Sequence, residues 1–135
     1  QQAPAESTGR ERFHWAGLEQ QLCALGDAAA ADVQATLTAF TAQACADSVR
    51  PFSDGAHTLL VCGGGALNAY LMAQLQQRLP QLQVVSTAAR GLPPLQVEAA
   101  AFAWLARQCW LGQAGNLPAV TGAQGPRILG AIYQA

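Results

Sequence analysis

The chain has 135 residues, of which 51% are apolar and 11% are charged, a composition typical of a folded globular protein and not of a disordered one. All seven basic residues are arginines and the net charge is -1, so no basic face is available for a phosphate backbone and nucleic acid is not an expected partner. No apolar run approaches the roughly 20 residues of a spanning helix, and the first ten residues lack the apolar segment of a signal peptide, so we expect a cytoplasmic protein that does not associate with a membrane.

The beginning of the chain differs in character from the rest. Residues 1–12 are polar and contain a proline, which predicts a linker or inter-domain segment, such as would open a domain cut from a larger protein. Residues 13–135 are predicted to form one α/β domain. A short helix around Trp15 is expected first, with Ser7 or Thr8 as its N-terminal cap.

A longer helix is predicted over residues 30–50. Asp32 in the first turn favours the positive end of the helix dipole, and Pro51 is expected to end the helix. The apolar residues that recur at helical spacing, and that we expect to face the core, are Val33, Leu37, Phe40 and Ala44.

A β-α-β unit is predicted over residues 57–87. Residues 58–62 form a continuous apolar run that is typical of a strand in a parallel sheet, and three glycines end it. A helix with a leucine stripe follows and Pro80 closes it, after which residues 83–87 form a second short strand. The two strands should be parallel, with a right-handed crossover.

The C-terminal third is predicted to contain one helix and one strand. A loop rich in glycine and proline leads into an alanine-rich helix over residues 95–111. Residues 112–125 are expected to be a loop, and residues 127–133 are expected to form a last apolar strand.

The glycines Gly63, Gly64 and Gly65 are the first candidate site. Without side chains, their backbone N–H groups can approach a ligand, and the helix that follows would add its positive dipole end, so a phosphate or nucleotide would fit there. A purely structural turn remains open, since junctions between strands and helices often use a glycine for steric reasons. The dinucleotide pattern is not met, because Asn68 stands where its third glycine would be, and no Lys–Ser/Thr pair of a Walker loop follows.

Glu98 is the second candidate, an acid in the first turn of the alanine-rich helix. A stabilising interaction with the helix dipole and a functional role near the mouth of the sheet both remain open. The four cysteines contain no Cys-x-x-Cys pair and neither histidine lies near them in sequence, so we expect no metal site and no disulfide framework. The serines lack a nucleophile motif, and we name no catalytic residue within the chain.

Several strings together resemble one family. In the same order along the chain, they closely resemble the C-terminal part of anhydro-N-acetylmuramic acid kinase, and the resemblance covers nearly all 135 residues. The strings are residues 7–13, 61–68, 91–106, 115–123 and 129–133.

The resemblance implies a fold and an activity. The fold would be the C-terminal, nucleotide-side α/β domain of the actin/hexokinase/Hsp70-like (ribonuclease H-like) class, with a β-α-β nucleotide-binding unit. Such kinases cleave the 1,6-anhydro ring of anhydro-N-acetylmuramic acid with water and phosphorylate O6 from ATP with Mg²⁺, which gives N-acetylmuramic acid 6-phosphate for cell-wall recycling. The resemblance assigns Gly63, Gly64, Gly65 and Asn68 to ATP and Glu98 to the sugar, and it implies a homodimer.

Two family segments are absent from these residues. They are the N-terminal phosphate loop and the segment with the aspartate that activates water, so the partner that this chain would need is the N-terminal domain of the parent enzyme. We therefore expect a fragment that is inactive alone, because phosphoryl transfer needs all these groups positioned together. A non-catalytic nucleotide-binding or sensor module is the alternative, and a turn whose glycines serve only packing is the third reading.

Overall fold

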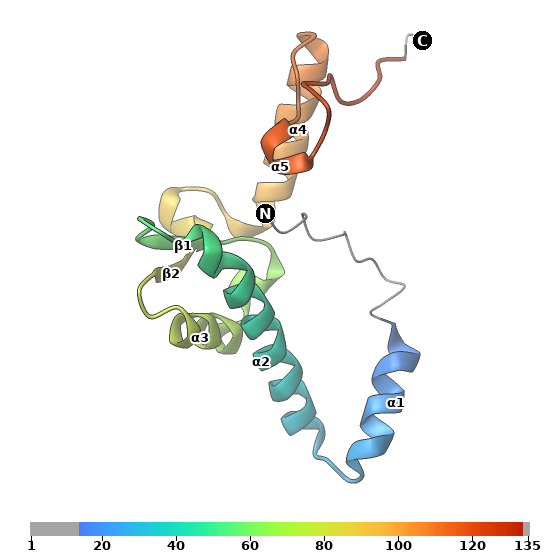
Figure 1. Cartoon of the computed structure of the whole chain (residues 1–135), viewed down its shortest axis with the longest axis vertical. Coiled ribbons are helices and arrows are strands. Elements are labelled where there is room, and N and C mark those ends of the chain that lie inside the picture. Colours follow the sequence, from blue (N-terminus) through green and yellow to red (C-terminus); the bar gives the residue numbers. More distant parts are fainter. Residues whose placement is uncertain (1–13, 134–135) are drawn as a thin grey trace. The chain divides into compact units, whose positions relative to one another are not determined.

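The computed structural model describes residues 14–133, so the predicted linker at residues 1–12 and its capping serine and threonine lie outside the described part. The described residues divide into two compact units, residues 14–37 and residues 38–133, and each is described by itself (Figure 1). The elements are helices, short 3₁₀ turns and two strands, which makes the protein a mixed α/β structure.

The first unit contains helix α1 (Trp15–Leu25) and the beginning of helix α2 (Ala30–Val49). The His14 side chain caps α1, because its ring Nδ1 accepts the N–H of Gly17 at 3.0 Å. Between the two helices the chain reverses at Gly26, whose φ of 63° lies in the left-handed region that favours glycine.

In the second unit, the buried face of α2 differs from the predicted one. Thr38, Ala42 and Ala46 are buried, whereas the aromatic ring expected to face the core, that of Phe40, is 63% exposed. Small side chains let the backbone of α2 approach its neighbours closely. The face with the small residues is therefore buried, and the stripe with the larger apolar side chains is not. The helix ends at Val49, and Pro51 follows in a 3₁₀ turn, Arg50–Phe52.

The predicted β-α-β unit is present. Strand β1 (Thr58–Val61) and strand β2 (Gln83–Ser86) pair in parallel, and helix α3 (Ala69–Arg78) connects them (Figure 1). The register sets Thr58 opposite Gln83.

The core of this unit is small and lies where α2 meets the end of α3. Ala46, Leu79 and Leu82 are buried there, and Val49 and Leu59 pack against them. Two polar contacts reinforce the packing of α2 on α3. Arg78 Nε donates to Gln43 Oε1 at 3.1 Å, and an Arg50 N–H donates to the Arg78 carbonyl oxygen at 3.3 Å.

The Gln76 side chain ties α3 to the second strand. Its Nε2 donates to the Leu82 carbonyl oxygen at 2.9 Å, and its Oε1 accepts the N–H of Val84 at 3.0 Å. Both atoms replace hydrogen bonds that the backbone would otherwise make with water, so this one residue fixes where β2 begins relative to α3.

The C-terminal region contains helix α4 (Val97–Trp110) and the short helix α5 (Pro118–Thr121). The strand predicted over residues 127–133 is wrong, because this segment has no regular structure and no strand partner among the described residues. It meets its neighbours through Asn116, whose Oδ1 accepts the N–H of Arg127 at 2.6 Å and whose Nδ2 donates to the Gly125 carbonyl oxygen at 3.1 Å.

The four cysteines have free thiols, and three of them, Cys23, Cys45 and Cys62, are exposed. Among the helices that the structure describes, none is both long and apolar enough to cross a membrane.

Candidate functional site

The glycine turn lies at the carboxyl end of the parallel sheet. Gly63 follows β1 and the segment 87–96 follows β2, so both connections leave the sheet at the same edge. In open α/β sheets this edge is where ligands bind. The two connections touch there, because the Gly63 N–H donates to the Pro94 carbonyl oxygen at 2.8 Å.

Gly63 itself has a conformational reason to be glycine. Its φ is 74° and its ψ is -173°, a combination that side-chain-bearing residues adopt only with strain. Since its N–H is already bonded to Pro94, this residue shapes the turn and has no free amide to offer a ligand.

Gly65 has a packing reason. A Cβ atom added there would lie 3.2 Å from Leu71 Cδ2, which is tighter than an ordinary contact, so the glycine lets the Leu71 side chain pack against the turn.

Gly64 has neither reason. Its φ lies outside the left-handed region, and a Cβ atom added there would meet no atom within 4 Å. Within residues 14–133, no hydrogen bond takes up the N–H of Gly64 or of Gly65. The turn therefore offers two adjacent unpaired donors beside open space.

The sequence suggested that the glycine turn leads directly into the helix, but the structure differs. A 3₁₀ turn, Gly64–Leu67, comes first, and α3 begins at Ala69. Asn68 is the N-cap of α3, and its Oδ1 accepts the N–H of Leu71 at 3.0 Å. The Asn68 oxygen is thus committed to the helix, while its exposed amide nitrogen remains available as a donor.

Glu98 lies in the first turn of α4, four residues after the proline that bonds to Gly63. Its side chain is exposed and forms no ion pair with another described residue. The hydrogen bond from Gly63 to Pro94 therefore connects the glycine turn to the segment that carries Glu98.

Two features of this edge were not predicted from the sequence. The Pro94 carbonyl group is one, and no local pattern indicates it, because its partner is 31 positions earlier in the chain. Thr87 is the other, since its Oγ1 is buried at the end of β2 without a hydrogen-bond partner among the described residues. Within the same residues, no group of three or more His, Cys, Asp or Glu side chains could hold a metal ion.

Comparison with known proteins gives one consistent result. Residues 1–135 match the family model described as anhydro-N-acetylmuramic acid kinase. The chain is 56% identical over 133 residues to the protein of that name from Variovorax paradoxus, and the match covers 98% of the chain and 36% of the relative. It is also 56% identical over 134 residues to the one from Albidiferax ferrireducens, covering 99% of the chain and 34% of the relative.

A more distant relative agrees in both name and coverage. The anhydro-N-acetylmuramic acid kinase of Thiobacillus denitrificans is 52% identical over 136 residues, which is 100% of the chain and 37% of that relative. The chain thus spans little more than a third of the length of these relatives. The match of the whole chain to the family model, with identities above half, shows that it belongs to the anhydro-N-acetylmuramic acid kinase family.

Proposed function

We propose that this chain is the nucleotide-side α/β part of an ATP-dependent kinase that opens the 1,6-anhydro ring of anhydro-N-acetylmuramic acid and phosphorylates O6, in cell-wall recycling in the cytoplasm. The fold of the whole enzyme would be of the actin/hexokinase/Hsp70-like class, with the glycine turn as its nucleotide-contacting element. Family membership supports the activity, and the parallel β-α-β unit is compatible with this class of fold.

Gly64 carries the assignment of the turn to ATP. Conformation explains Gly63 and packing explains Gly65, but neither explains why the middle residue lacks a side chain. A phosphate or ribose oxygen that accepts the free N–H groups of Gly64 and Gly65 would explain it, since a Cβ atom there would enter the space of the ligand. Asn68 would add its amide nitrogen as a further donor.

ATP supplies the phosphoryl group when it is bound, and Mg²⁺ would accompany it. The described residues fit the nucleotide but not the metal ion, because they bring no group of three metal-ligating side chains together. The chain's own contribution would be to hold and orient the nucleotide, with Glu98 facing the sugar from the segment next to the turn.

The rest of the catalytic machinery would belong to an N-terminal domain outside this chain, and the complete enzyme would be a homodimer. Relatives that are nearly three times as long support this division of labour. Phosphoryl transfer requires the γ-phosphate, the metal ion and the attacking oxygen to be positioned together. We therefore expect the chain alone to bind nucleotide weakly and to show no turnover.

A two-part experiment tests the proposal. A non-hydrolysable ATP analogue is titrated into the isotopically labelled chain while the amide signals of residues 63–68 are followed. This chain is then grafted in place of the matched part of the Variovorax paradoxus kinase, and ATP-dependent phosphorylation of the anhydrosugar is assayed.

We expect the turn signals to shift and the grafted kinase to turn over. No shift at millimolar nucleotide would favour a turn whose glycines serve only packing. A grafted protein that binds ATP and never phosphorylates the sugar would instead favour a non-catalytic nucleotide sensor.

A further inference from the structure

Helix α1 begins at a histidine that acts as its cap. His14 has an extended backbone, with a φ of -120° and a ψ of 159°, and its ring Nδ1 accepts the N–H of Gly17 at 3.0 Å. The first N–H groups of a helix have no partner inside the helix, so a side-chain acceptor at this position stabilises the first turn. Asn, Asp, Ser and Thr usually supply that acceptor, so a histidine is an uncommon cap.

Gly17 lets the ring of His14 approach the helix. A Cβ atom added at Gly17 would lie 3.2 Å from His14 Cε1, which is tighter than an ordinary contact. The φ of Gly17 lies outside the left-handed region, so contact with the ring and not conformation accounts for a glycine at this position. The ring therefore packs directly on the backbone of the first turn.

The hydrogen bond from Gly17 requires a neutral imidazole. A ring nitrogen accepts a hydrogen bond only when it carries no proton, so the ring proton of the capped state is assigned to Nε2. Protonation turns Nδ1 into a donor, which removes the cap, and it places a positive charge at the positive end of the helix dipole. Histidine side chains ordinarily change charge between about pH 5 and 8. Capping and protonation of His14 therefore exclude each other within this range of pH.

The other titratable groups of this unit do not pair with the ring. The only acid on α1 is Glu19, and it accepts a hydrogen bond from an indole N–H instead. Cys23, Asp27 and Asp32 lie toward the opposite end of α1, where the chain turns into α2 (Figure 1). Among the described residues, no carboxylate forms an ion pair with His14, so no neighbouring negative charge offsets protonation of the ring.

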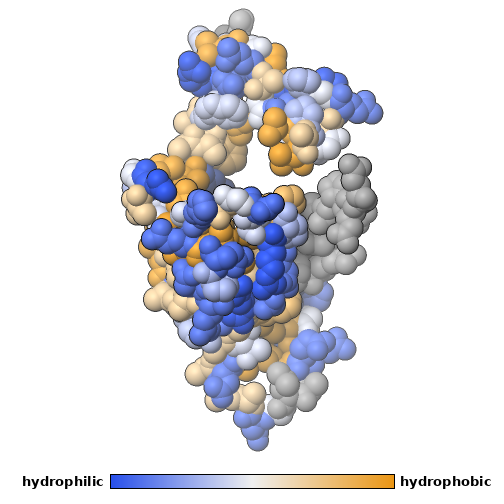
Figure 2. Space-filling model, turned by 60° about the vertical axis from the view of Figure 1, so that its left-hand side comes forward, coloured by the Kyte–Doolittle hydropathy of each residue, from blue (hydrophilic) through white to orange (hydrophobic). Residues whose placement is uncertain are grey.

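Trp15, the first residue of α1, connects the cap to an apolar groove. The groove lies between α1 and the beginning of α2, and the large apolar side chains that line it are Trp15, Leu18, Leu22, Val33 and Leu37. Figure 2 shows hydrophobic side chains at the surface among hydrophilic ones, at the height of α1 in Figure 1. The indole N–H of Trp15 donates to Glu19 Oε1, a contact that depends on helical geometry because residues four apart face each other on a helix. Loss of the first turn would therefore take Trp15 away from the edge of the groove.

We propose that His14 is a pH-sensitive cap, which holds the first turn of α1 in place when its ring is neutral and releases the turn when its ring is protonated. The groove beside α1 keeps its Trp15 edge at neutral pH and loses it in mildly acidic solution. His14 and the groove both belong to the unit of residues 14–37, so the proposal does not rest on the proposed function of the glycine turn.

A pH titration of the whole, isotopically labelled chain by nuclear magnetic resonance tests the proposal. At about pH 8 the ring of His14 should carry its proton on Nε2, and the Cα shifts of residues 15–18 should be helical. As the pH falls, the Gly17 amide signal should move with the same midpoint as the His14 ring. The ratio of capped to frayed first turns should drop by about two- to thirtyfold, the usual effect of losing a cap. A Gly17 signal that does not follow the ring, or an α1 without helical shifts at about pH 8, would overturn the proposal.

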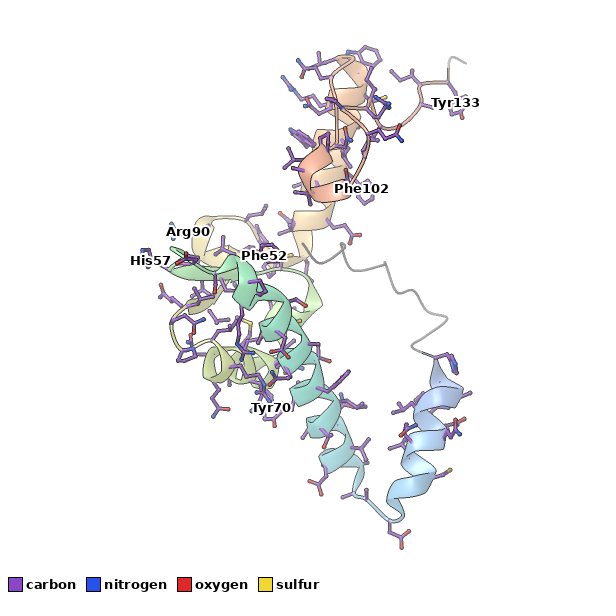
Figure 3. The ribbon with its side chains drawn as sticks, in the orientation of Figure 1. Phe52, His57, Tyr70, Arg90, Phe102 and Tyr133 are labelled. Carbon is purple, nitrogen blue, oxygen red and sulfur yellow. The ribbon has the colours of Figure 1, made fainter. Side chains whose placement is uncertain are left out.

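Substitutions at the two histidines of the chain provide matched controls. His14→Asn keeps an acceptor that does not titrate, so α1 should stay helical and the pH-dependent shift of Gly17 should disappear. His14→Ala removes the cap at every pH and should resemble the protonated protein. Figure 3 labels the second histidine, His57, which directly precedes β1, and His57→Asn should leave the pH dependence of α1 unchanged. A pH dependence that persists in His14→Asn, or that His57→Asn abolishes, would contradict the cap.

The indole signals give a second readout from the same titration. The chain has three tryptophans, and the indole N–H signal of Trp15 should move with the midpoint of His14, because its bond to Glu19 depends on the first turn. The indole signals of Trp104 and Trp110, on α4, should not move and serve as internal controls. A Trp15 signal that stays constant while the ring titrates would contradict release of the first turn. The titration uses the unsubstituted chain without nucleotide or sugar, so its result is independent of how the variants fold and of the proposed function.

Discussion

Alanine substitutions at Gly63 and Gly64 should have opposite consequences, although the two residues are neighbours. Gly63→Ala should destabilise the protein by about 1–3 kcal/mol, the usual cost of forcing a side-chain-bearing residue into a region of backbone space that only glycine occupies freely. The native φ of 74° and ψ of -173° lie in that region. Since an added Cβ atom would meet nothing within 4 Å, backbone strain alone sets this magnitude.

Gly64→Ala should leave stability unchanged or raise it by up to about 1 kcal/mol. Its φ is outside the left-handed region and its surroundings are open, so the methyl group fits and reduces the freedom of the unfolded chain. For a protein of this size, about 1 kcal/mol corresponds to roughly 4 °C in the unfolding midpoint. Thermal unfolding followed by circular dichroism should therefore place Gly63→Ala about 4–16 °C below Gly64→Ala.

Nucleotide binding should show the reverse order once folding is accounted for. Gly64→Ala places a methyl group where we propose that ATP lies, so the fully folded variant should bind the analogue at least about tenfold more weakly, a loss of about 1.4 kcal/mol. Equal stabilities of the two variants would refute the strain argument. A folded Gly64→Ala protein with unchanged affinity would refute the placement of ATP at the turn.

Five further substitutions, at four positions, test how the site is held, and thermal or urea unfolding measures each of them. Asn68→Ala should cost about 0.5–2 kcal/mol through loss of the α3 cap, and Asn68→Asp should restore most of it. Gln76→Leu should cost about 2 kcal/mol or more, because it leaves the Leu82 carbonyl and the Val84 N–H without their partner. Thr87→Val should be neutral or stabilising, since the Oγ1 atom it removes is buried without a partner. Leu79→Ala should cost about 2–5 kcal/mol, since its side chain is fully buried.

The β-α-β unit could be predicted from the sequence because local signals define it. An apolar run, a glycine turn, a leucine stripe and one proline follow each other within about thirty residues, and parallel pairing of the two strands is the expected arrangement for such a unit. The strands are one residue shorter than expected, ending at Val61 and Ser86. End effects of this size are normal, since pairing with the neighbouring strand decides where a strand stops.

The buried face of α2 and the C-terminal segment could not be predicted in this way. Periodicity marks which residues share a face, and the largest apolar side chains suggested the stripe with Phe40. The structure buries Ala42 and Ala46 instead, and Ala46 packs with Leu79 and Leu82, where close approach favours a small residue. Residues 127–133 read as a strand, but a strand needs a partner, and within the described residues this segment meets α4 and Asn116.

At the candidate site, the sequence located the glycines but did not distinguish their roles. Three consecutive glycines predicted a single property, the absence of side chains. The structure divides them into one residue required by its conformation, one by packing and one by neither, and it shows that α3 begins only at Ala69. The bond from Gly63 to Pro94 depends on tertiary contact between two connections, so no pattern along the chain could indicate it.

The hydrogen bonds that hold the glycine turn all lie within a short part of the chain. Gly63, Pro94, Asn68 and Gln76 hold the turn through contacts that lie within residues 63–94, so the turn can keep its geometry in this chain alone. The segment after Pro94 continues directly into α4, which carries Glu98 in its first turn. The isolated chain is therefore expected to keep the glycine turn that we propose for ATP.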